Sequence, residues 1–228
     1  MQEKKETYQA AIYSLLLTII PWLVQLINSL FSLNLQRFGL SPLNWGGLTG
    51  ILTLPFLHDG WDHLMSNTLS VFLLMFGLFL FYKRKAWKIL FCLYLVSGLL
   101  TWFMGRPLST HVGASGLVYA LAAFHFISGI MKKVPQQLAF SLLVAFLYGG
   151  FIWAFFPTLY QHTSISWEGH LSGLLTGISF AFYFRRLGPE PPIYPFMTEP
   201  DNEKDDEDAY WNTSASDNEE KTTQETNE

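Results

Sequence analysis

The sequence predicts an all-α membrane protein with six transmembrane helices, and two observations carry that prediction. Half of the 228 residues are hydrophobic and only 14% are charged, whereas a soluble globular protein carries about a quarter charged residues. The apolar residues also fall into uncharged stretches, most of them long enough to cross a bilayer core of about 30 Å as a helix. These stretches are residues 7–36, 64–82, 89–105, 107–131, 134–167 and 169–184.

The six stretches differ in how clearly they indicate a helix. The first helix is expected from about residue 10 to residue 31, and the fifth from about 137 to 156. The basic run 83–85 ends the second stretch. The stretch 169–184 is short and contains a histidine, so hydropathy alone supports it least. The segment 32–57 is interrupted by Gly, Pro and Asn but still apolar, so we expect an outer loop that rests on or dips into the membrane surface.

The charges divide the chain into two parts. Residues 1–187 hold 12 Lys or Arg and 5 Asp or Glu, whereas residues 188–228 hold 2 and 13. Ten of the 12 basic residues lie at the same set of helix ends, so the positive-inside rule places both termini in the cytoplasm. We therefore expect a six-span domain over 1–187 and an acidic, disordered cytoplasmic tail over 188–228. The single cysteine, Cys92, excludes an intrachain disulfide.

Polar side chains within the apolar stretches are the candidates for function, because a bilayer makes them costly to bury. Counting along each helix to the cytoplasmic basic residues puts Asn67, Ser115 and His170 at heights of about 24, 26 and 22 Å. The three residues therefore lie at one depth, towards the outer face of the membrane. His63 precedes Asn67 by four residues and shares its helix face.

This set of residue types fits acyl transfer. Ser115 follows the loop 106–112 and begins the fourth helix, where unpaired backbone N–H groups can stabilise an oxyanion. A serine hydroxyl becomes a nucleophile when a neutral imidazole takes its proton, and His170 lies at the matching depth. We predict a Ser115–His170 dyad without a third acidic member, because Glu168 lies about 200° round the helix from His170. His111, four residues before Ser115, is the competing base.

Other residues are expected to support this pair. Tyr119 lies one turn below Ser115 on the same face and is expected to pack against His170. The small residues of the fourth and sixth helices fit the small-xxx-small rule for close helix packing. They are Gly116, Ala120, Ala123, Gly173 and Gly177. His125 is expected to be a hydrogen-bonded bundle residue, and His58 and His162 are expected in outer loops.

Three segments together resemble the rhomboid family of intramembrane serine proteases. They are residues 56–67 (FLHDGWDHLMSN), 113–120 (GASGLVYA) and 170–177 (HLSGLLTG). Their order and spacing match the family, and the likeness covers about residues 55–187. The resemblance implies that the protein cleaves single-pass membrane proteins within or just outside their transmembrane segment. It also implies an acyl-enzyme on Ser115, with His170 as the base.

The resemblance further implies roles for residues around the dyad. His63, Asn67 and the Ser115 N–H would form the oxyanion site, and Gly113 would help to open the preceding loop. One feature departs from the family, because many rhomboids carry a Trp-Arg pair in the first outer loop. Here Arg37 and Trp45 are well apart, a difference that bears on loop packing or lipid contact and does not exclude catalysis.

Two other classes of protein fit part of the pattern. A rhomboid-like pseudoprotease would act as a membrane binding or quality-control factor, but such relatives usually lack the serine or the histidine. A small transporter would favour charged or broken-helix sites at the midplane, whereas this polar cluster lies towards one face. We expect transmembrane proteins as substrates and a bacterial inner membrane as the location. We expect no nucleic acid, metal or cofactor.

Overall fold

A computed structural model describes residues 2–148 and 166–190, and its regular elements are helices. The α-helices are α1 (Gln2–Phe31), α2 (Gly50–Thr53), α3 (Trp61–Tyr82), α4 (Lys85–Met104), α5 (Ser115–Lys132), α6 (Pro135–Tyr148) and α7 (Trp167–Tyr183). The 3-10 turns η1 (Leu35–Phe38), η2 (Trp45–Thr49) and η3 (Leu54–Phe56) lie between α1 and α3. The predicted all-α fold class is confirmed. His162 and the predicted acidic tail beyond residue 190 lie outside the described residues.

Four helices of the described part are long and apolar enough to cross a membrane, namely α1, α3, α4 and α5. The chain is therefore an integral membrane protein. Helix α6 has 14 described residues and α7 has 17, fewer than the roughly 20 that a bilayer core requires. The predicted fifth helix continues to residue 156, outside the described residues. The structure supports four of the six predicted spans by length and composition, and the count of six stays a prediction.

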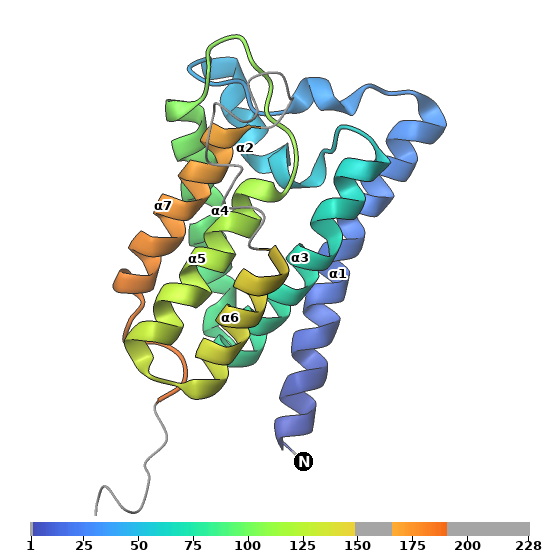
Figure 1. Cartoon of the computed structure of the whole chain (residues 1–228). Helices are drawn as coiled ribbons and strands as arrows, with labels where there is room; N and C mark the ends of the chain where they lie inside the picture. The colour runs from blue at the N-terminus through green and yellow to red at the C-terminus, as the bar shows by residue number, and fades with distance from the viewer. Residues whose placement is uncertain (1, 149–165, 191–228) are drawn as a thin grey trace, which may run out of the picture. The chain divides into compact units, whose positions relative to one another are not determined.

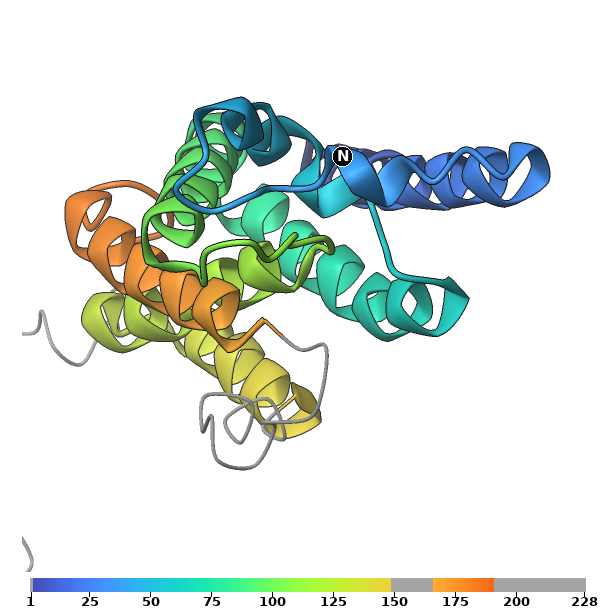
Figure 2. The ribbon, with the colours of Figure 1, turned by 90° about the horizontal axis from the view of Figure 1, so that it is seen from above.

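Helix α5 lies in the middle of the bundle and is contacted by α3, α4, α6 and α7 (Figures 1 and 2). Its most extensive contact is with α7. Apolar side chains on several sides of α5 are buried, including Val118, Leu121 and Phe124. A helix that is covered on several sides in this way needs apolar residues on several faces, which explains why its sequence shows no polar stripe.

Helix α1 lies at the edge of the bundle against α3 (Figure 2). The face that it buries consists of small and polar residues, whereas it exposes large aliphatic ones such as Leu16, Leu23 and Leu30. This pattern is the reverse of a water-exposed helix and suits a helix that faces lipid. The hydroxyls of Ser14 and Thr18 donate to carbonyls of their own helix, which satisfies them without water.

The long helices alternate in direction, and this alternation positions the site. The start of α1, the turns after α3 and α5, and the end of α7 lie at one end of the bundle (Figure 1). Three contacts hold this end together: Lys83 with Glu6 at 2.8 Å, the Lys132 ammonium with the Leu187 carbonyl, and the Gln137 amide with the Tyr82 hydroxyl at 2.8 Å. The starts of α3, α5 and α7 therefore lie at the opposite end, away from the basic turns.

Candidate active site

Ser115 and His170 meet at the end of the bundle opposite the basic turns. Ser115 is the first residue of α5 and His170 lies in the first turn of α7. The His170 Nε2 atom lies 3.0 Å from the Ser115 Oγ atom. The Tyr119 ring stacks on the His170 ring with centroids 4.3 Å apart and planes at 27°. An aromatic stack on one face and a hydroxyl at the ring edge fix the orientation of the imidazole.

The distance between these two side chains is set by direct backbone contact of α5 with α7. A Cβ atom placed on Gly173 would overlap the Gly116 carbonyl and lie 3.1 Å from the Ala120 backbone nitrogen. A Cβ on Gly177 would lie 2.8 Å from the Ala123 Cβ and 2.9 Å from the Phe124 nitrogen. No side chain fits between the helices at either level, as the small-xxx-small pattern requires.

His63 lies against the segment that leads into Ser115. Gly113 has φ +111°, and a Cβ placed on it would lie 2.6 Å from His63 Cε1 and 2.8 Å from His63 Nε2. The Asp59 N–H donates to His63 Nδ1 at 3.5 Å, the long limit for a hydrogen bond. A neutral imidazole that accepts at Nδ1 carries its proton on Nε2. The Nε2–H donor of His63 thus faces the Gly113 backbone, two residues before Ser115.

Asn67 lies one turn further along α3 and is buried. Its Nδ2 atom donates to the His63 carbonyl at 3.0 Å, within the same helix. This bond uses one of the two amide hydrogens. The start of α5 contributes backbone donors of its own, because the first N–H groups of a helix have no partner within the helix.

His58 is a residue whose part in the site the sequence did not reveal. It lies in the loop before α3, but it is only 2% exposed. Its Nε2 atom accepts a hydrogen bond from the Ala114 N–H at 3.4 Å, so it contacts the residue before Ser115. Burial, and to a smaller extent the neighbouring His63, lower the pKa of His58 to about 4. His58 is therefore neutral at pH 7 and remains an acceptor.

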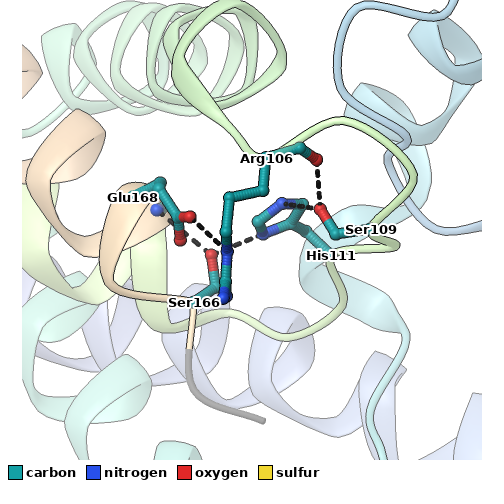
Figure 3. A network of polar contacts seen from close by, with 6 residues as sticks. Arg106, Ser109, His111, Ser166 and Glu168 are labelled. Atoms are coloured by element: carbon teal, nitrogen blue, oxygen red, sulfur yellow. Dashed lines mark hydrogen bonds and ion pairs between the residues drawn. The ribbon is translucent and has the colours of Figure 1, made fainter. Parts of the chain in front are cut away.

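The competing base, His111, is engaged elsewhere. Its Nε2 lies 2.8 Å from the Ser109 hydroxyl and its Nδ1 lies 2.5 Å from the Ser166 hydroxyl. The carboxylate of Glu168 pairs with Arg106 beside these residues (Figure 3). The sequence did not predict these contacts.

The remaining buried histidine has a local role. His125 Nε2 lies 3.0 Å from the Leu74 carbonyl, among aromatic rings of α3, α5 and α6. The expectation of a hydrogen-bonded bundle histidine is confirmed. Across residues 2–148 and 166–190, no three His, Cys, Asp or Glu side chains gather as a metal site would require.

Comparison with known proteins finds similarity over much of the chain. A family model of the rhomboid domain matches residues 45–187. An uncharacterised protein of Mycobacterium tuberculosis is 35% identical over 167 residues, which are 71% of this chain and 69% of the relative. An uncharacterised protein of Mycobacterium leprae is 30% identical over 166 residues, 71% of this chain and 66% of the relative. Rhomboid-related protein 1 of Caenorhabditis elegans is 31% identical over 134 residues, 56% of this chain and 37% of that protein.

The fold and the site together define a helical integral membrane protein with a serine–histidine pair near one end of its bundle. The chain belongs to the rhomboid family. Membership of this family suggests intramembrane protease activity.

Proposed function

We propose that this protein is an intramembrane serine endopeptidase in which Ser115 is the nucleophile and His170 is the general base. The observation that carries the proposal is the 3.0 Å contact between His170 Nε2 and Ser115 Oγ. This is the separation at which an imidazole can take the hydroxyl proton as the oxygen attacks. The alternative base, His111, has both ring nitrogens on other hydroxyls.

The reaction follows from this geometry in two halves. The Ser115 oxygen attacks the scissile carbonyl and its proton passes to His170 Nε2. The C–N bond then breaks, and the leaving amine takes that proton, so that an acyl ester remains on Ser115. Water hydrolyses the ester with His170 again acting as the base, which restores the free hydroxyl.

The tetrahedral intermediate of each half carries a negative oxygen that needs donors. We propose that the Ser115 N–H, the His63 Nε2–H and the second amide hydrogen of Asn67 supply them. The contact of His63 with Gly113 and the position of Ser115 at the start of α5 support this assignment. Removal of one such donor costs about 100- to 1,000-fold in kcat in other serine proteases.

We also propose the orientation, the membrane and the class of substrate. The positive-inside rule applied to the basic turns puts both termini in the cytoplasm, which places the site near the extracytoplasmic surface of a bacterial inner membrane. Residues 1–187 would form a six-span domain and residues 188–228 an acidic cytoplasmic tail. The substrates would be single-pass membrane proteins whose helix unwinds near that surface, because an extended backbone must reach Ser115.

The test uses purified protein in detergent and in liposomes. A fluorophosphonate probe should label the parent protein, and a transmembrane substrate should be cleaved. Ser115→Ala should abolish both, and His170→Ala should abolish cleavage, with thermal unfolding close to that of the parent. Ser179→Ala is the matched control, because this hydroxyl lies on α7 but bonds only back to Leu175 at 2.8 Å within the described structure. Unchanged labelling of Ser115→Ala would refute the assignment, and a folded parent without activity would indicate a pseudoprotease.

A further inference from the structure

The loop between α4 and α5 is tied to the start of α7 by polar contacts that include neither Ser115 nor His170 (Figure 3). The Arg106 Nε atom lies 2.6 Å from a carboxylate oxygen of Glu168. The Glu168 side chain is 1% exposed, whereas the Arg106 side chain is 59% exposed. The pair thus joins a buried anion on α7 to a cation that reaches the aqueous surface.

Hydrogen bonds around His111 form a second connection between the same two segments. The Ser109 hydroxyl donates to the Arg106 carbonyl at 2.6 Å, so it accepts from His111 Nε2. His111 Nδ1 is then the acceptor for the Ser166 hydroxyl, which itself accepts from the Gly169 N–H at 3.1 Å as the cap of α7. One proton is available for each of these bonds when His111 is neutral. Burial, the largest influence, lowers the pKa of His111 and favours that form.

The loop is also fixed on its other side. The His111 N–H donates to the Leu40 carbonyl at 2.8 Å and the Leu40 N–H donates to the His111 carbonyl at 3.0 Å. His111 therefore connects the segment between α1 and α3, the loop before α5, and the start of α7. Three segments that are far apart in sequence thus meet at one buried residue, through its backbone at Leu40 and through its ring at Ser166.

The ion pair is the connection with the largest energetic consequence. A carboxylate as buried as that of Glu168 is strongly unfavourable without a counter-charge. Within the described parts of the chain, Arg106 is the cation that contacts it, and neither carboxylate oxygen has a hydrogen bond of acceptable geometry. The contact is therefore a charge pair, helped by the position of Glu168 in the first turn of α7, where a helix favours negative charge.

We propose that Arg106 and Glu168 are positioning residues whose ion pair holds the start of α7, and with it the His170 ring, in register with Ser115. Arg106 lies at the start of the loop that leads to Ser115, and Glu168 lies two residues before His170. The pair therefore connects the loop that leads to Ser115 with the first turn of the helix that carries His170. This inference rests on the proposed protease function and assigns a further pair of residues to it.

Because Glu168 is buried and Arg106 is exposed, the two single substitutions of a double-mutant cycle should lower kcat by different amounts. Arg106→Gln leaves a buried carboxylate without its cation, so kcat should fall about 100-fold, as displacements of about 1 Å do in other enzymes. Glu168→Gln leaves a cation that water can solvate, so kcat should fall about 10-fold or less. The double variant Arg106→Gln/Glu168→Gln should be about 10-fold more active than Arg106→Gln alone. Arg106→Lys should recover part of the loss, because the charge is kept and the planar guanidinium is not.

The readouts separate positioning from general stability. We would measure kcat and KM for a transmembrane substrate, the rate of fluorophosphonate labelling, and thermal unfolding of each variant. Positioning predicts losses in kcat and labelling rate, with KM within about threefold of the parent and a double variant that regains activity. Arg37→Gln is the matched control, because Arg37 lies at the same end of the bundle over the Phe38 ring and should leave kcat unchanged.

The outcomes distinguish the inference from the proposed function. If the parent shows Ser115-dependent labelling and Arg106→Gln labels at the parent's rate, the inference fails and the protease assignment stands. Single-variant losses that simply add in the double variant, or that follow the fall in unfolding temperature, also overturn it. A parent without Ser115-dependent labelling refutes the proposed function itself, and the inference with it.

Discussion

Two helix pairs in this bundle, α5 with α7 and α1 with α3, both bury small residues, but they hold their partners differently. On α7, Gly173 and Gly177 bring the backbone directly against the backbone of α5. On α1, the hydroxyls of Ser14 and Thr18 bond to carbonyls of the same helix. Contact with α3 is made instead by side chains, including the hydrogen bond from Trp22 Nε1 to the Thr68 hydroxyl at 3.0 Å.

The two helix pairs differ in how much displacement their contacts can tolerate. Backbone contact between α5 and α7 leaves no rotatable group that can take up a displacement, so a shift there moves Ser115 relative to His170. The α1 side has space, because an apolar cavity of about 220 Å³ lies between α1, η3, α3, α4 and α5. Its walls include Leu17, Pro21, Met75, Leu90 and Leu117. The geometry of the Ser115–His170 pair is thus held by the part of the bundle that cannot adjust, and α1 lies at a distance from it.

The largest effect is expected from adding one methyl group between α5 and α7. Gly173→Ala places a Cβ on the Gly116 carbonyl, so the helices must separate near His170. We expect kcat to fall more than about 100-fold and the free energy of unfolding to fall by about 1–3 kcal/mol. The same change at Gly46 is the control, since its nearest neighbour would be the Asn44 side-chain oxygen at 3.4 Å. Cleavage by Gly173→Ala at the parent's rate would show that the contact does not fix the pair.

Gly113→Ala tests the loop side of the same site. The new methyl meets the His63 ring and must also adopt φ +111°, so the donor and the loop are both displaced. We expect kcat to fall by about 10- to 100-fold. Gly60→Ala is the control that adds backbone strain without a steric clash, because Gly60 has φ +91° and nothing lies within 4 Å of a Cβ placed on it. That control should lose about 1 kcal/mol of stability and keep its kcat; equal losses of kcat in the two variants would contradict this view.

His58 links the two regions, because it lies just before α3 and accepts from Ala114 just before α5. Its pKa of about 4 in the fold is below the ordinary 6.5, so the folded state binds the proton less well than the unfolded state. Its contribution to stability is therefore complete above pH 6.5 and declines as the pH falls towards 4. Between pH 7 and pH 5 the loss is about 2 kcal/mol.

The variant that isolates this contribution is His58→Gln, whose side-chain oxygen can still accept from the Ala114 N–H. Between pH 7 and pH 5, the unfolding free energy of the parent should fall by about 2 kcal/mol more than that of the variant. The parent and the variant share every other titratable group, so the difference between their pH dependences of unfolding free energy is the measurement. Parallel slopes would show that His58 is not the group that resists protonation.

Much of the fold and of the proposed dyad could be predicted from the sequence, because both depend on local patterns. Uncharged stretches ending in basic residues predict the long helices, and similar counts from those ends predict similar depths for Ser115 and His170. The glycine spacing on the sixth stretch likewise predicts the contact of α5 with α7. These features need only helix geometry and the thickness of a bilayer.

The contacts that the sequence did not predict depend on loop paths. Residues 105–114 bring His111 to Leu40 and to Ser166, and no periodicity encodes such a path. One signal was available for the ion pair. Glu168 is the single charge between residues 134 and 184, and Arg106 is one of two basic residues at the predicted outer end. A buried charge requires a partner of opposite charge, so these counts could have predicted that Glu168 pairs with Arg106.

The smallest effect is expected where α1 meets α3. Trp22→Phe removes the hydrogen bond to Thr68 but keeps an aromatic ring beside Trp61, whose ring centroid lies 5.8 Å from that of Trp22. The loss should be about 1 kcal/mol of unfolding free energy, with kcat within about twofold of the parent, because the adjacent cavity lets α1 move without displacing α5. Thr68→Val removes the acceptor instead and should cost a similar amount, and the double variant should cost little more than either alone. A large fall in kcat without a fall in stability would mean that α1 also holds the reacting pair, and the contrast between the two helix pairs would be lost.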